Sequence, residues 1–511
     1  MGIPAYFAKT IRSYRKIIKD VEKHPDFLYM DANSIIYQVY YDVLGKLEQQ
    51  IQSTTSIEDA LYQGVFLEIK QYIETIKPSS MVYIAFDGVA PFAKMKQQRT
   101  RRFKSSYLRH LNNKQELWNT TNITTGTCFM NALKENLEKQ FKATTMYSSL
   151  NIIIDSSDEE GEGEQKIMKH IRSLDSKKKI YIYGLDADLI ILALRHIEYQ
   201  PQLYLVREMY KEKKLTCVDI PLLRLFILKT MTEEKDVSVI RNANEIIQDY
   251  VCLSFFLGND FMPHFPSLCI RSNGIDILMR CYKKVIYSKK RTLCSHEQIQ
   301  WNMMKALIKE LAKNEEYYIR KETHERNEKS CDRFPLLQYR QEEHIIDVHT
   351  SGWESRYYQY LFHSKADESF IQNVCTNYIE GLQWNYYYYF KDDCPSPTWY
   401  YKYNYPPLLS DLLEHMPDFQ TNMLASYTSQ DESYLQLTKG QRSSVQLHYV
   451  LPKSCYSSIP EAYRKEDVCY EDGQKDDPCS FIWAYCTYFW ESHLLHDAPI
   501  QKWIHVQEET E

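Results

Sequence analysis

Short β-prone runs alternate with helical patterns over about the first 280 residues, and this alternation constrains the fold more than any other feature of the sequence. The β-prone runs are Phe27–Met30, Val82–Phe86, Asn151–Ile154, Ile180–Tyr183 and Gln202–Val206. Between them lie amphipathic stretches such as Ile57–Ile76 and Gln165–Leu174, where apolar residues recur at helical spacing. We therefore predict an α/β fold in which a mostly parallel central sheet is flanked by helices.

Four of these predicted strands lead into an aspartate, either directly or within a few residues: Asp31, Asp87, Asp155 and Asp186. The carboxyl ends of parallel strands meet along one edge of a sheet, where α/β proteins bind ligands. A single aspartate in such a position is more often a helix N-cap than a ligand. Several of them at one edge indicate a shared acidic site.

Three local motifs add further carboxylates. Gly-Glu-Gly-Glu (161–164) contributes Glu162 and Glu164 just before a predicted helix, and Gly-Leu-Asp-Ala-Asp-Leu (184–189) contributes Asp186 and Asp188 at a strand-to-helix turn. Phe-Leu-Gly-Asn-Asp-Phe-Met-Pro-His (256–264) ends an apolar helix in a turn that exposes Asp260. The alternative for each aspartate is a helix cap, and for the 161–164 segment it is a solvated surface turn.

Carboxylates that lie this close repel one another, and their pKa values rise unless a cation neutralises them. A set of hard oxygen ligands without histidine or cysteine suits Mg²⁺ or Mn²⁺ better than zinc. Two such ions could polarise a phosphodiester, activate water and stabilise the leaving oxygen. The acidic motifs therefore predict a site for divalent ions that acts on phosphodiester bonds.

A basic segment follows the second predicted strand. Residues 94 to 109 include seven Lys or Arg and no acid, although the net charge of the whole chain is −6. On a helix that begins near residue 91, one face presents Lys94, Gln98, Arg101 and Arg102. A terminal 5′-monophosphate carries about −1.5 to −2 charges at pH 7, more than an internal diester, so a compact basic face favours the end of a strand. The alternative is a basic patch for localisation or general nucleic-acid contact.

The thirteen cysteines are scattered and form no Cys-x-x-Cys pair, which speaks against zinc fingers and redox motifs. No run of about 18 apolar residues is present, and the N-terminus lacks the charged-then-apolar pattern of a signal peptide. We therefore expect reduced thiols, a cytoplasmic location and no contact with membranes.

Several long segments, collinear along the chain, resemble a known family. They are Met-Gly-Ile-Pro at the N-terminus, Leu-Tyr-Met-Asp-Ala-Asn-Ser-Ile-Ile-Tyr (28–37), Phe-Asp-Gly-Val-Ala-Pro-Phe-Ala-Lys-Met-Lys-Gln-Gln-Arg-Thr-Arg-Arg-Phe (86–103), Gly-Glu-Gly-Glu-Gln-Lys-Ile-Met (161–168) and Ile-Tyr-Gly-Leu-Asp-Ala-Asp-Leu-Ile (182–190). The 256–264 motif and Tyr-Ile-Glu-Gly-Leu-Gln-Trp-Asn-Tyr-Tyr-Tyr-Tyr (378–389) complete the set. Together these segments closely resemble the Xrn family of 5′→3′ exoribonucleases.

The resemblance implies hydrolysis of single-stranded RNA from a 5′-monophosphate end, with nucleoside 5′-monophosphates as products. It implies a catalytic lobe similar to that of flap nucleases and PIN domains, and an α-rich second region that closes the site. It also implies a site for two Mg²⁺ ions, or Mn²⁺, formed by Asp31, Asp87, Glu162, Glu164, Asp186, Asp188 and Asp260. By the same resemblance, the 5′-phosphate pocket consists of Lys94, Gln98, Arg101 and Arg102.

Members of the family clamp the first bases between aromatic groups, one of them a histidine shortly after the first catalytic aspartate. Tyr37 stands at that position here, and Trp384 resembles the opposing aromatic residue, with Trp399 as a second candidate. Stacking on an aromatic side chain contributes about 1–3 kcal/mol per base. The alternative for both tryptophans is packing in the core. Glu160 and Gln165 also depart from the proline and histidine usual in the family.

We predict four regions along the chain: a catalytic α/β domain (1–284), a helical connecting segment (285–345), an aromatic-rich second region that closes the site (346–415) and a C-terminal segment without an assigned role (416–511). The alternative enzyme is a flap-type or DNA-directed 5′ nuclease, because its α/β lobe has a similar acidic edge. The alternative without catalysis is an RNA-binding scaffold, and the presence of all seven expected acids argues against it.

Overall fold

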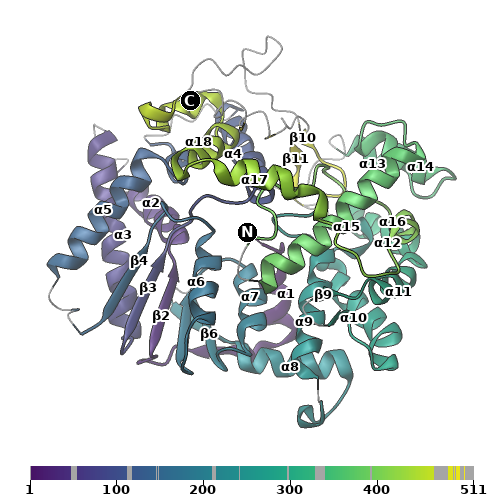
Figure 1. Ribbon diagram of the computed structural model, residues 1–511, viewed down its shortest axis with the longest axis horizontal. Helices are drawn as coiled ribbons and strands as arrows, with labels where there is room; N and C mark the ends of the chain where they lie inside the picture. The colour runs from purple at the N-terminus through teal and green to yellow at the C-terminus, as the bar shows by residue number, and fades with distance from the viewer. Residues whose placement is uncertain are drawn as a thin grey trace.

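A seven-stranded sheet forms the centre of the N-terminal lobe (Figure 1). Five adjacent strands of this sheet, β2 to β6, are parallel to one another. In spatial order the strands are β1 (Ile18–Asp20), β7 (Lys214–Asp219), β6 (Gln202–Met209), β5 (Lys179–Tyr183), β2 (Phe27–Asp31), β3 (Met81–Ala85) and β4 (Asn151–Asp155). The computed structural model describes residues 2–47, 54–111, 118–144, 147, 149–209, 214–240, 242–295, 298–328, 340–391, 394–464, 481–486, 488, 491–494, 500 and 504.

The five predicted strands are confirmed, and the mostly parallel α/β architecture is confirmed with them. Two strands of this sheet were not predicted. β7 returns antiparallel alongside β6, and β1 pairs antiparallel with β7 at the edge of the sheet. β1 has three residues, none of them buried, and β7 mixes apolar residues with Lys, Thr and Asp. Neither strand therefore carries the apolar run or the strict alternation that marks a strand in sequence.

Helices cover both faces of the sheet, because alternate residues along each strand point to opposite sides. Leu28 and Met30 of β2 pack into the core on one side, beneath α2 (Asn33–Leu47), α3 (Thr54–Ile76) and α5 (Cys128–Ala143). Tyr29 of the same strand points to the other side. There the covering helices are α1 (Tyr6–Ser13), α6 (Gly163–Arg172), α7 (Asp188–His196), α8 (Ile220–Thr232) and α9 (Ala243–Ser254).

An α-rich second region lies beside the sheet lobe, on the right of Figure 1. Its helices are α10 (Gly274–Val285), α11 (Trp301–Ala312), α12 (Glu315–Glu328), α13 (Gln341–Ile346), α14 (Trp353–Leu361), α15 (Glu368–Phe390) and α16 (Leu409–His415). One continuous apolar core joins the two parts, since Ile190 of α7 and Trp384 of α15 belong to the same buried cluster. The α-rich region is therefore packed directly against the lobe that carries the sheet.

The long helix α4 (Phe92–Leu111) joins the sheet lobe to the C-terminal helices α17 (Thr428–Gln436) and α18 (Lys439–Val450). Phe92 and Met95 at its start share a buried cluster with Tyr434 and Val445. Two short hairpins complete the described structure, β8 (Cys294–Ser295) with β9 (Gln298–Ile299), and β10 (Phe481–Ile482) with β11 (His493–Leu494). In the part of the chain that the structure describes, the helices are all too short or too polar to cross a membrane.

Candidate active site

The carboxyl ends of β5, β2 and β3, which are neighbours in the sheet, bring three of the predicted acids to one edge. Asp31 is the last residue of β2, Asp87 follows β3 by two residues, and Asp186 follows β5 by three. Asp188 begins α7. Parallel strands point their carboxyl ends in the same direction, so acids placed this way must converge.

The other carboxylates reach the same edge from helix ends. Glu162 is the N-cap residue of α6 and Glu164 lies in the first turn of that helix, where a carboxylate interacts favourably with the helix dipole. Asp260 stands in the turn after α9, and Asn259 fixes this turn by accepting hydrogen bonds from the backbone N–H groups of Phe261 and Met262, each at 3.0 Å.

Burial and mutual repulsion shape the electrostatics of the cluster. Asp31 is 8% exposed and Asp188 is 2% exposed. Burial, reinforced by the charges of Asp87 and Asp186, raises the pKa of Asp31 well above its usual range. Burial and the charge of Asp260 raise the pKa of Asp188 to about 7. These carboxylates therefore need a nearby positive charge in order to stay ionised together at neutral pH.

Glu162 and Glu164 complete the cluster. Burial, with the charge of Glu162 added, raises the pKa of Glu164 well above its usual range, and Asp188 and Asp186 act on it in the same direction. The pKa of Glu162 is raised by burial and by Asp87, against the opposing effect of Lys94. Each of the seven predicted acids thus lies within electrostatic reach of at least one other, and the structure brings all seven together.

Lys94 supplies a positive charge inside this cluster. Its Nζ forms ion pairs with Glu162 and with Asp260, the latter at 2.8 Å. Burial acts to raise the pKa of Asp260, but the ammonium of Lys94 and other positive charges, among them Arg101, together hold the pKa below its usual value. Among the described residues, no three His, Cys, Asp or Glu side chains form a ready-made metal site. Lys94 instead lies between two of the acids.

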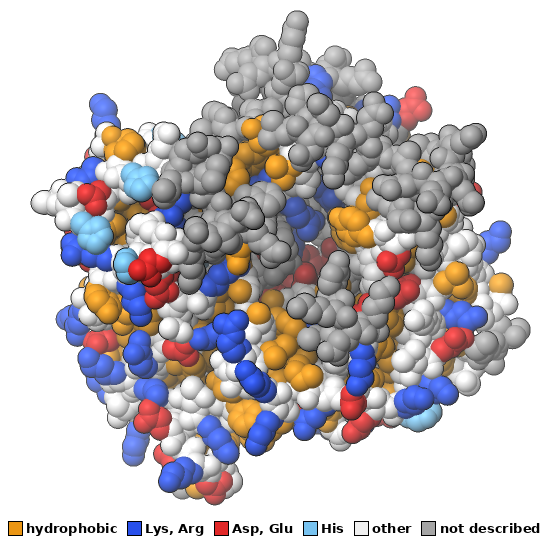
Figure 2. Space-filling model, turned by 180° about the vertical axis from the view of Figure 1, so that it is seen from behind, with side chains coloured by type: hydrophobic (Ala, Val, Ile, Leu, Met, Phe, Trp, Pro, Cys, Tyr) orange, Lys and Arg blue, Asp and Glu red, His pale blue; other side chains and the backbone are white. Residues whose placement is uncertain are grey.

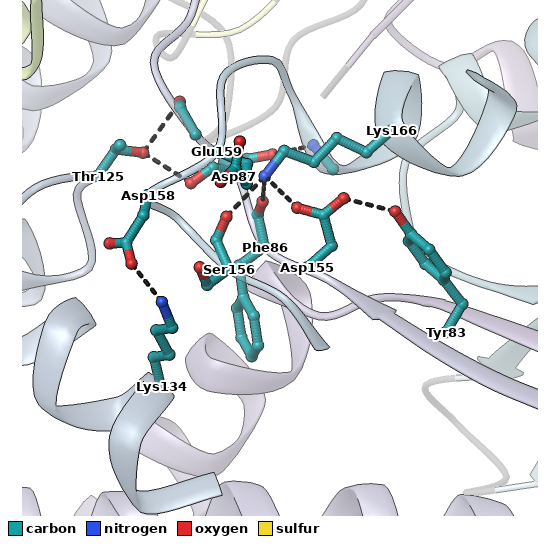
Figure 3. A network of polar contacts seen from close by, with 12 residues as sticks. Tyr83, Phe86, Asp87, Thr125, Lys134, Asp155, Ser156, Asp158, Glu159 and Lys166 are labelled. Atoms are coloured by element: carbon teal, nitrogen blue, oxygen red, sulfur yellow. Dashed lines mark hydrogen bonds and ion pairs between the residues drawn. The ribbon is translucent and has the colours of Figure 1, made fainter. Parts of the chain in front are cut away.

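Asp87 is held in place by neighbours that the sequence analysis did not single out. Its Oδ2 accepts a hydrogen bond from Asn33 Nδ2 at 2.6 Å, and its Oδ1 accepts one from the backbone N–H of Gly163 at 2.8 Å. Thr125 Oγ1 donates to the carbonyl oxygen of Asp87 at 2.8 Å (Figure 3). A Cβ at Gly88 would lie 1.6 Å from the carbonyl oxygen of Glu159, so only glycine allows the loop after β4 to approach this closely.

The N-terminal segment contacts the cluster as well. The backbone N–H of Ile3 donates to Asp188 Oδ1 at 3.1 Å, and a Cβ at Gly2 would lie 2.3 Å from the same oxygen. Gly2 also has a positive φ of 54°. Gly2 and Ile3, which entered the sequence analysis only within a resemblance, therefore lie against one of the acids, and the position of Gly2 requires glycine.

Helix α15 reaches the cluster from the second region. The hydroxyl of Tyr388 donates to Glu162 Oε1, and Asn385 on the same helix accepts a hydrogen bond from Asn259 Nδ2 at 2.6 Å. The four tyrosines 386–389 of this helix are largely buried. Tyr388 nevertheless donates a hydrogen bond to a predicted metal ligand. No sequence motif around Tyr388 predicts this contact.

Trp384 is completely buried, which argues against the predicted base-stacking role. Its ring stacks on Tyr388 at 4.8 Å and on Trp399 at 5.3 Å, and its Nε1 donates to the carbonyl oxygen of Ser396. Trp399 is also completely buried. Both rings are therefore used for packing within the second region, and neither has a free face for a base. The alternative considered for these tryptophans, core packing, describes what the structure shows.

The four polar residues predicted on one face of α4 have different surroundings. Gln98 is buried and accepts a hydrogen bond from Gln446 Nε2 at 3.4 Å. Arg102 donates to the carbonyl oxygens of Thr120 at 3.2 Å and Ile123 at 2.7 Å. Lys94, as described above, turns towards the acids. The structure therefore does not gather all four side chains around one point.

Arg101 and Tyr37 lie near each other between α4 and α2. Burial alone raises the pKa of Tyr37, but the charges of Arg102 and Arg101 outweigh it and lower the pKa. The charges of Asp260, Asp186 and Asp87 also act on Arg101. Among the described residues we find no hydrogen-bond acceptor for the Arg101 guanidinium, so its donors remain available to a ligand beside the acidic cluster.

The back of the molecule is hollowed near its centre, and acidic side chains lie inside the hollow with Lys or Arg side chains next to them (Figure 2). A surface of this kind places carboxylates, which can hold cations, beside cationic groups, which can hold phosphate oxygens. Both kinds of group are needed to act on a phosphodiester chain.

Comparison with known proteins identifies the relatives of this chain. Residues 1–209 match the family model described as the XRN 5'-3' exonuclease N-terminus, and residues 241–349 and 337–467 match the model of the Xrn1 helical domain. The 5'-3' exoribonuclease 1 of Schizosaccharomyces pombe is 25% identical over 81% of this chain and 42% of its own length. The 5'-3' exoribonuclease 2 of Debaryomyces hansenii is 30% identical over 63% of this chain and 39% of its own length.

A third relative, the 5'-3' exoribonuclease 2 homolog of Drosophila melanogaster, is 24% identical over 91% of this chain and 66% of its own length. This chain therefore spans about two fifths of the two fungal relatives and nearly two thirds of the insect one. The two family models together cover most of the α/β lobe, including its acidic edge, and the helical region that closes against it. The chain belongs to the Xrn family of 5'-3' exonucleases.

Proposed function

We propose that the protein is a metal-dependent 5′→3′ exoribonuclease, which hydrolyses 5′-monophosphorylated single-stranded RNA to nucleoside 5′-monophosphates. The observation that carries this proposal is the convergence of seven carboxylates beside the basic helix α4, in a chain of this family. Its relatives are named 5'-3' exoribonucleases, which supports the substrate class and the direction.

The seven carboxylates are the residues that would hold two Mg²⁺ ions. Their donor set consists of hard oxygens only. Burial, with mutual repulsion added, raises the pKa values of Asp31, Glu164 and Asp188, and a divalent cation would counteract both effects. When bound, the ions would supply an activated water molecule and stabilise the leaving oxygen. The contacts from Asn33 and Gly163 orient Asp87, and the hydroxyl of Tyr388 orients Glu162, so the protein holds its ligands in place from behind.

Arg101 is the residue best placed to recognise the 5′-phosphate. It lies within electrostatic reach of Asp87, Asp186 and Asp260, and its planar guanidinium can donate two parallel hydrogen bonds to phosphate oxygens. Lys94 is the second candidate, provided that it leaves Glu162 and Asp260. The higher charge of a terminal monophosphate favours binding of an end at such a site.

The second region would restrict the reaction to the end of the RNA. Helix α15 closes over Glu162 through Tyr388, and Trp384, Tyr388 and Trp399 form a stacked, buried group behind it. A chain that continued past the acids on this side would meet the packed aromatic side chains. For the compartment we propose the cytoplasm, on the basis of the scattered cysteines; those that the structure describes are free thiols.

The proposal is tested by offering the purified protein RNAs that differ only at the 5′ end: hydroxyl, monophosphate, triphosphate and cap. Matched single-stranded and flapped DNA are included, and each substrate is incubated with Mg²⁺ or with EDTA. We expect release of mononucleotides from the monophosphorylated RNA in Mg²⁺ alone. Cleavage of flapped DNA irrespective of a 5′-phosphate would instead indicate a flap-type nuclease, and binding of RNA without any cleavage would indicate a scaffold.

A further inference from the structure

Lys166 is a buried cation directly behind the acidic cluster. It stands on α6, two residues after Glu164, and is 7% exposed. Its Nζ donates to the carbonyl oxygens of Ser156 at 2.7 Å and Phe86 at 3.0 Å, and forms an ion pair with Asp155 Oδ1 at 2.9 Å (Figure 3). Two of the three N–H donors of the ammonium are thus used in hydrogen bonds to carbonyl oxygens, and the ion pair with Asp155 adds a charge contact.

Each of these acceptors belongs to a segment that leads to a predicted ligand. Phe86 is the residue immediately before Asp87. Asp155 ends β4, and Ser156 begins the loop that runs to Glu162 at the start of α6. Lys166 itself is part of the helix that carries Glu164. One side chain thus joins the end of β3, the end of β4 and the first turns of α6.

Asp155 is the fourth of the aspartates at strand ends, and its role differs from that of the other three. It shows no contact with the acidic cluster; its Oδ1 pairs with Lys166 and its Oδ2 accepts a hydrogen bond from the hydroxyl of Tyr83. The ring of Tyr83 lies 4.8 Å from the ring of His170 on α6. A polar chain therefore runs from β3 through β4 to α6, and each charge in it has its partner.

The backbone of the same region leaves little freedom for movement. The N–H of Gly88 donates to the carbonyl oxygen of Gly161 at 2.8 Å, and the N–H of Gly161 donates to the carbonyl oxygen of Val89 at 3.0 Å. Lys166 donates hydrogen bonds to both of the segments that meet here, to Phe86 before Gly88 and to Ser156 before Gly161. Loss of its ammonium would leave two buried carbonyl groups without their donor and one carboxylate without its counter-charge.

We propose that Lys166, together with Asp155, is a positioning residue that keeps Asp87 in register with Glu162 and Glu164. It touches neither substrate nor metal; it acts through the backbone on which the ligands stand. The inference rests on the proposed function, because Asp87, Glu162 and Glu164 are ligands only in that function. A displacement of about 1 Å from remote support can lower a rate about 100-fold.

The test compares Lys166→Met, Lys166→Arg and Asp155→Asn with the unchanged protein. Lys134→Met serves as the matched control, since Lys134 pairs with Asp158 on the same loop but from its exposed side (Figure 3). Four quantities are measured: kcat and KM for 5′-monophosphorylated RNA, the Mg²⁺ affinity by calorimetry without RNA, and the melting temperature. Calorimetry measures how well the ligands bind Mg²⁺, and it requires no catalytic turnover.

For Lys166→Met we expect kcat to fall about 100-fold with KM changed by less than about threefold, and Mg²⁺ affinity to fall about 10- to 100-fold. Lys166→Arg should recover part of both losses because it keeps the charge, and Lys134→Met should match the unchanged protein. A folded Lys166→Met with normal kcat and normal Mg²⁺ affinity overturns the proposal. If Lys166→Met does not fold, Asp155→Asn decides by the same criterion.

The two proposals fail in different ways. If the unchanged protein binds Mg²⁺ but degrades no RNA, the proposed function fails, while calorimetry on the variants still tests the role of Lys166. If the unchanged protein degrades RNA and Lys166→Met does so equally well at limiting Mg²⁺, the proposed function stands and the positioning role is refuted.

Discussion

Asp188 combines burial with a hydrogen bond from the chain's own N-terminal segment. The backbone N–H of Ile3 donates to its Oδ1, and the side chain is 2% exposed. Asp188→Asn keeps the shape and can keep this contact, but removes the negative charge. We expect RNA degradation to fall by at least about 100-fold, since even residues behind metal ligands contribute about 10- to 100-fold. Mononucleotide release is measured beside RNA binding, which should persist; unchanged turnover in saturating Mg²⁺ would contradict the assignment.

Lys94 competes with a divalent cation for the same carboxylates, because its ammonium pairs with Glu162 and Asp260. We expect Lys94→Met to bind Mg²⁺ roughly tenfold more tightly in the absence of RNA, the effect of losing one charge-assisted hydrogen bond of about 1.5 kcal/mol. The same variant should bind 5′-monophosphorylated RNA more weakly. Calorimetry with Mg²⁺ and a fluorescence titration with RNA measure the two effects. Weaker Mg²⁺ binding would show that Lys94 supports the metal site instead.

The sequence predicts the identity of the acids far better than their surroundings. Asp31 and Asp188 stand at strand ends or helix starts, and the local pattern of residues places them there. The contacts that hold them come from elsewhere: Tyr388 meets Glu162 across 226 residues of chain. Trp384 shows what the sequence does not decide, because an aromatic residue in a segment that resembles a family can be a ligand contact or a core residue, and only packing distinguishes the two.

At the scale of secondary structure, the predicted strands are right because buried parallel strands are continuous apolar runs. β2 and β3 are buried almost throughout, and each appears in the sequence as such a run. β1 and β7 escape prediction because β1 is short and not buried, and β7 mixes apolar residues with polar ones. The missed strands lie at the edge away from β3 and β4, so the error leaves the location of the acidic edge unchanged.

Helix α15 links the second region to the acids through one hydroxyl group. Tyr388→Phe removes the donor to Glu162 but leaves the ring stacked on Trp384. We expect a folded protein that needs about 10- to 100-fold more Mg²⁺ for half-maximal activity, the usual cost of losing an outer contact to a metal ligand. Tyr378→Phe on the same helix is the control, because its hydroxyl makes only a 3.4 Å contact with the carbonyl oxygen of Pro263. Equal Mg²⁺ requirements in the two variants would contradict this role of α15.

At the scale of the whole molecule, the net charge does not reveal the site, because positive and negative side chains are concentrated in different segments. The chain carries a net charge of −6, yet α4 brings the cations of Lys94 and Arg101 to the edge where the buried acids gather. The order of the segments along the chain does not reveal this, since Glu162 and Asp260 are far apart in sequence and yet both pair with the ammonium of Lys94. Opposite charges collected from distant segments are what a phosphodiester and its cations require together.

This arrangement makes stability depend on pH and on Mg²⁺ together. Folding raises the pKa values of Asp31, Glu164 and Asp188, the last to about 7, so the folded protein holds more protons than the unfolded chain between about pH 4 and 7. The stability these groups contribute is complete below the unfolded pKa and is lost as the pH rises through the folded values. Mg²⁺ replaces the departing protons, so it should raise the melting temperature more at pH 8 than at pH 5.5.

The difference between melting temperatures with Mg²⁺ and with EDTA isolates this effect from groups that titrate elsewhere. His196 is one such group: burial lowers its pKa to about 3, so it destabilises the fold below about pH 6.5 whether or not Mg²⁺ is present. Subtracting the EDTA value at each pH removes its contribution. In Asp188→Asn one of the titrating acids is absent, so the increase in melting temperature caused by Mg²⁺ should vary less with pH. If Mg²⁺ raises the melting temperature of the unchanged protein equally at pH 5.5 and pH 8, the buried acids do not exchange protons for metal.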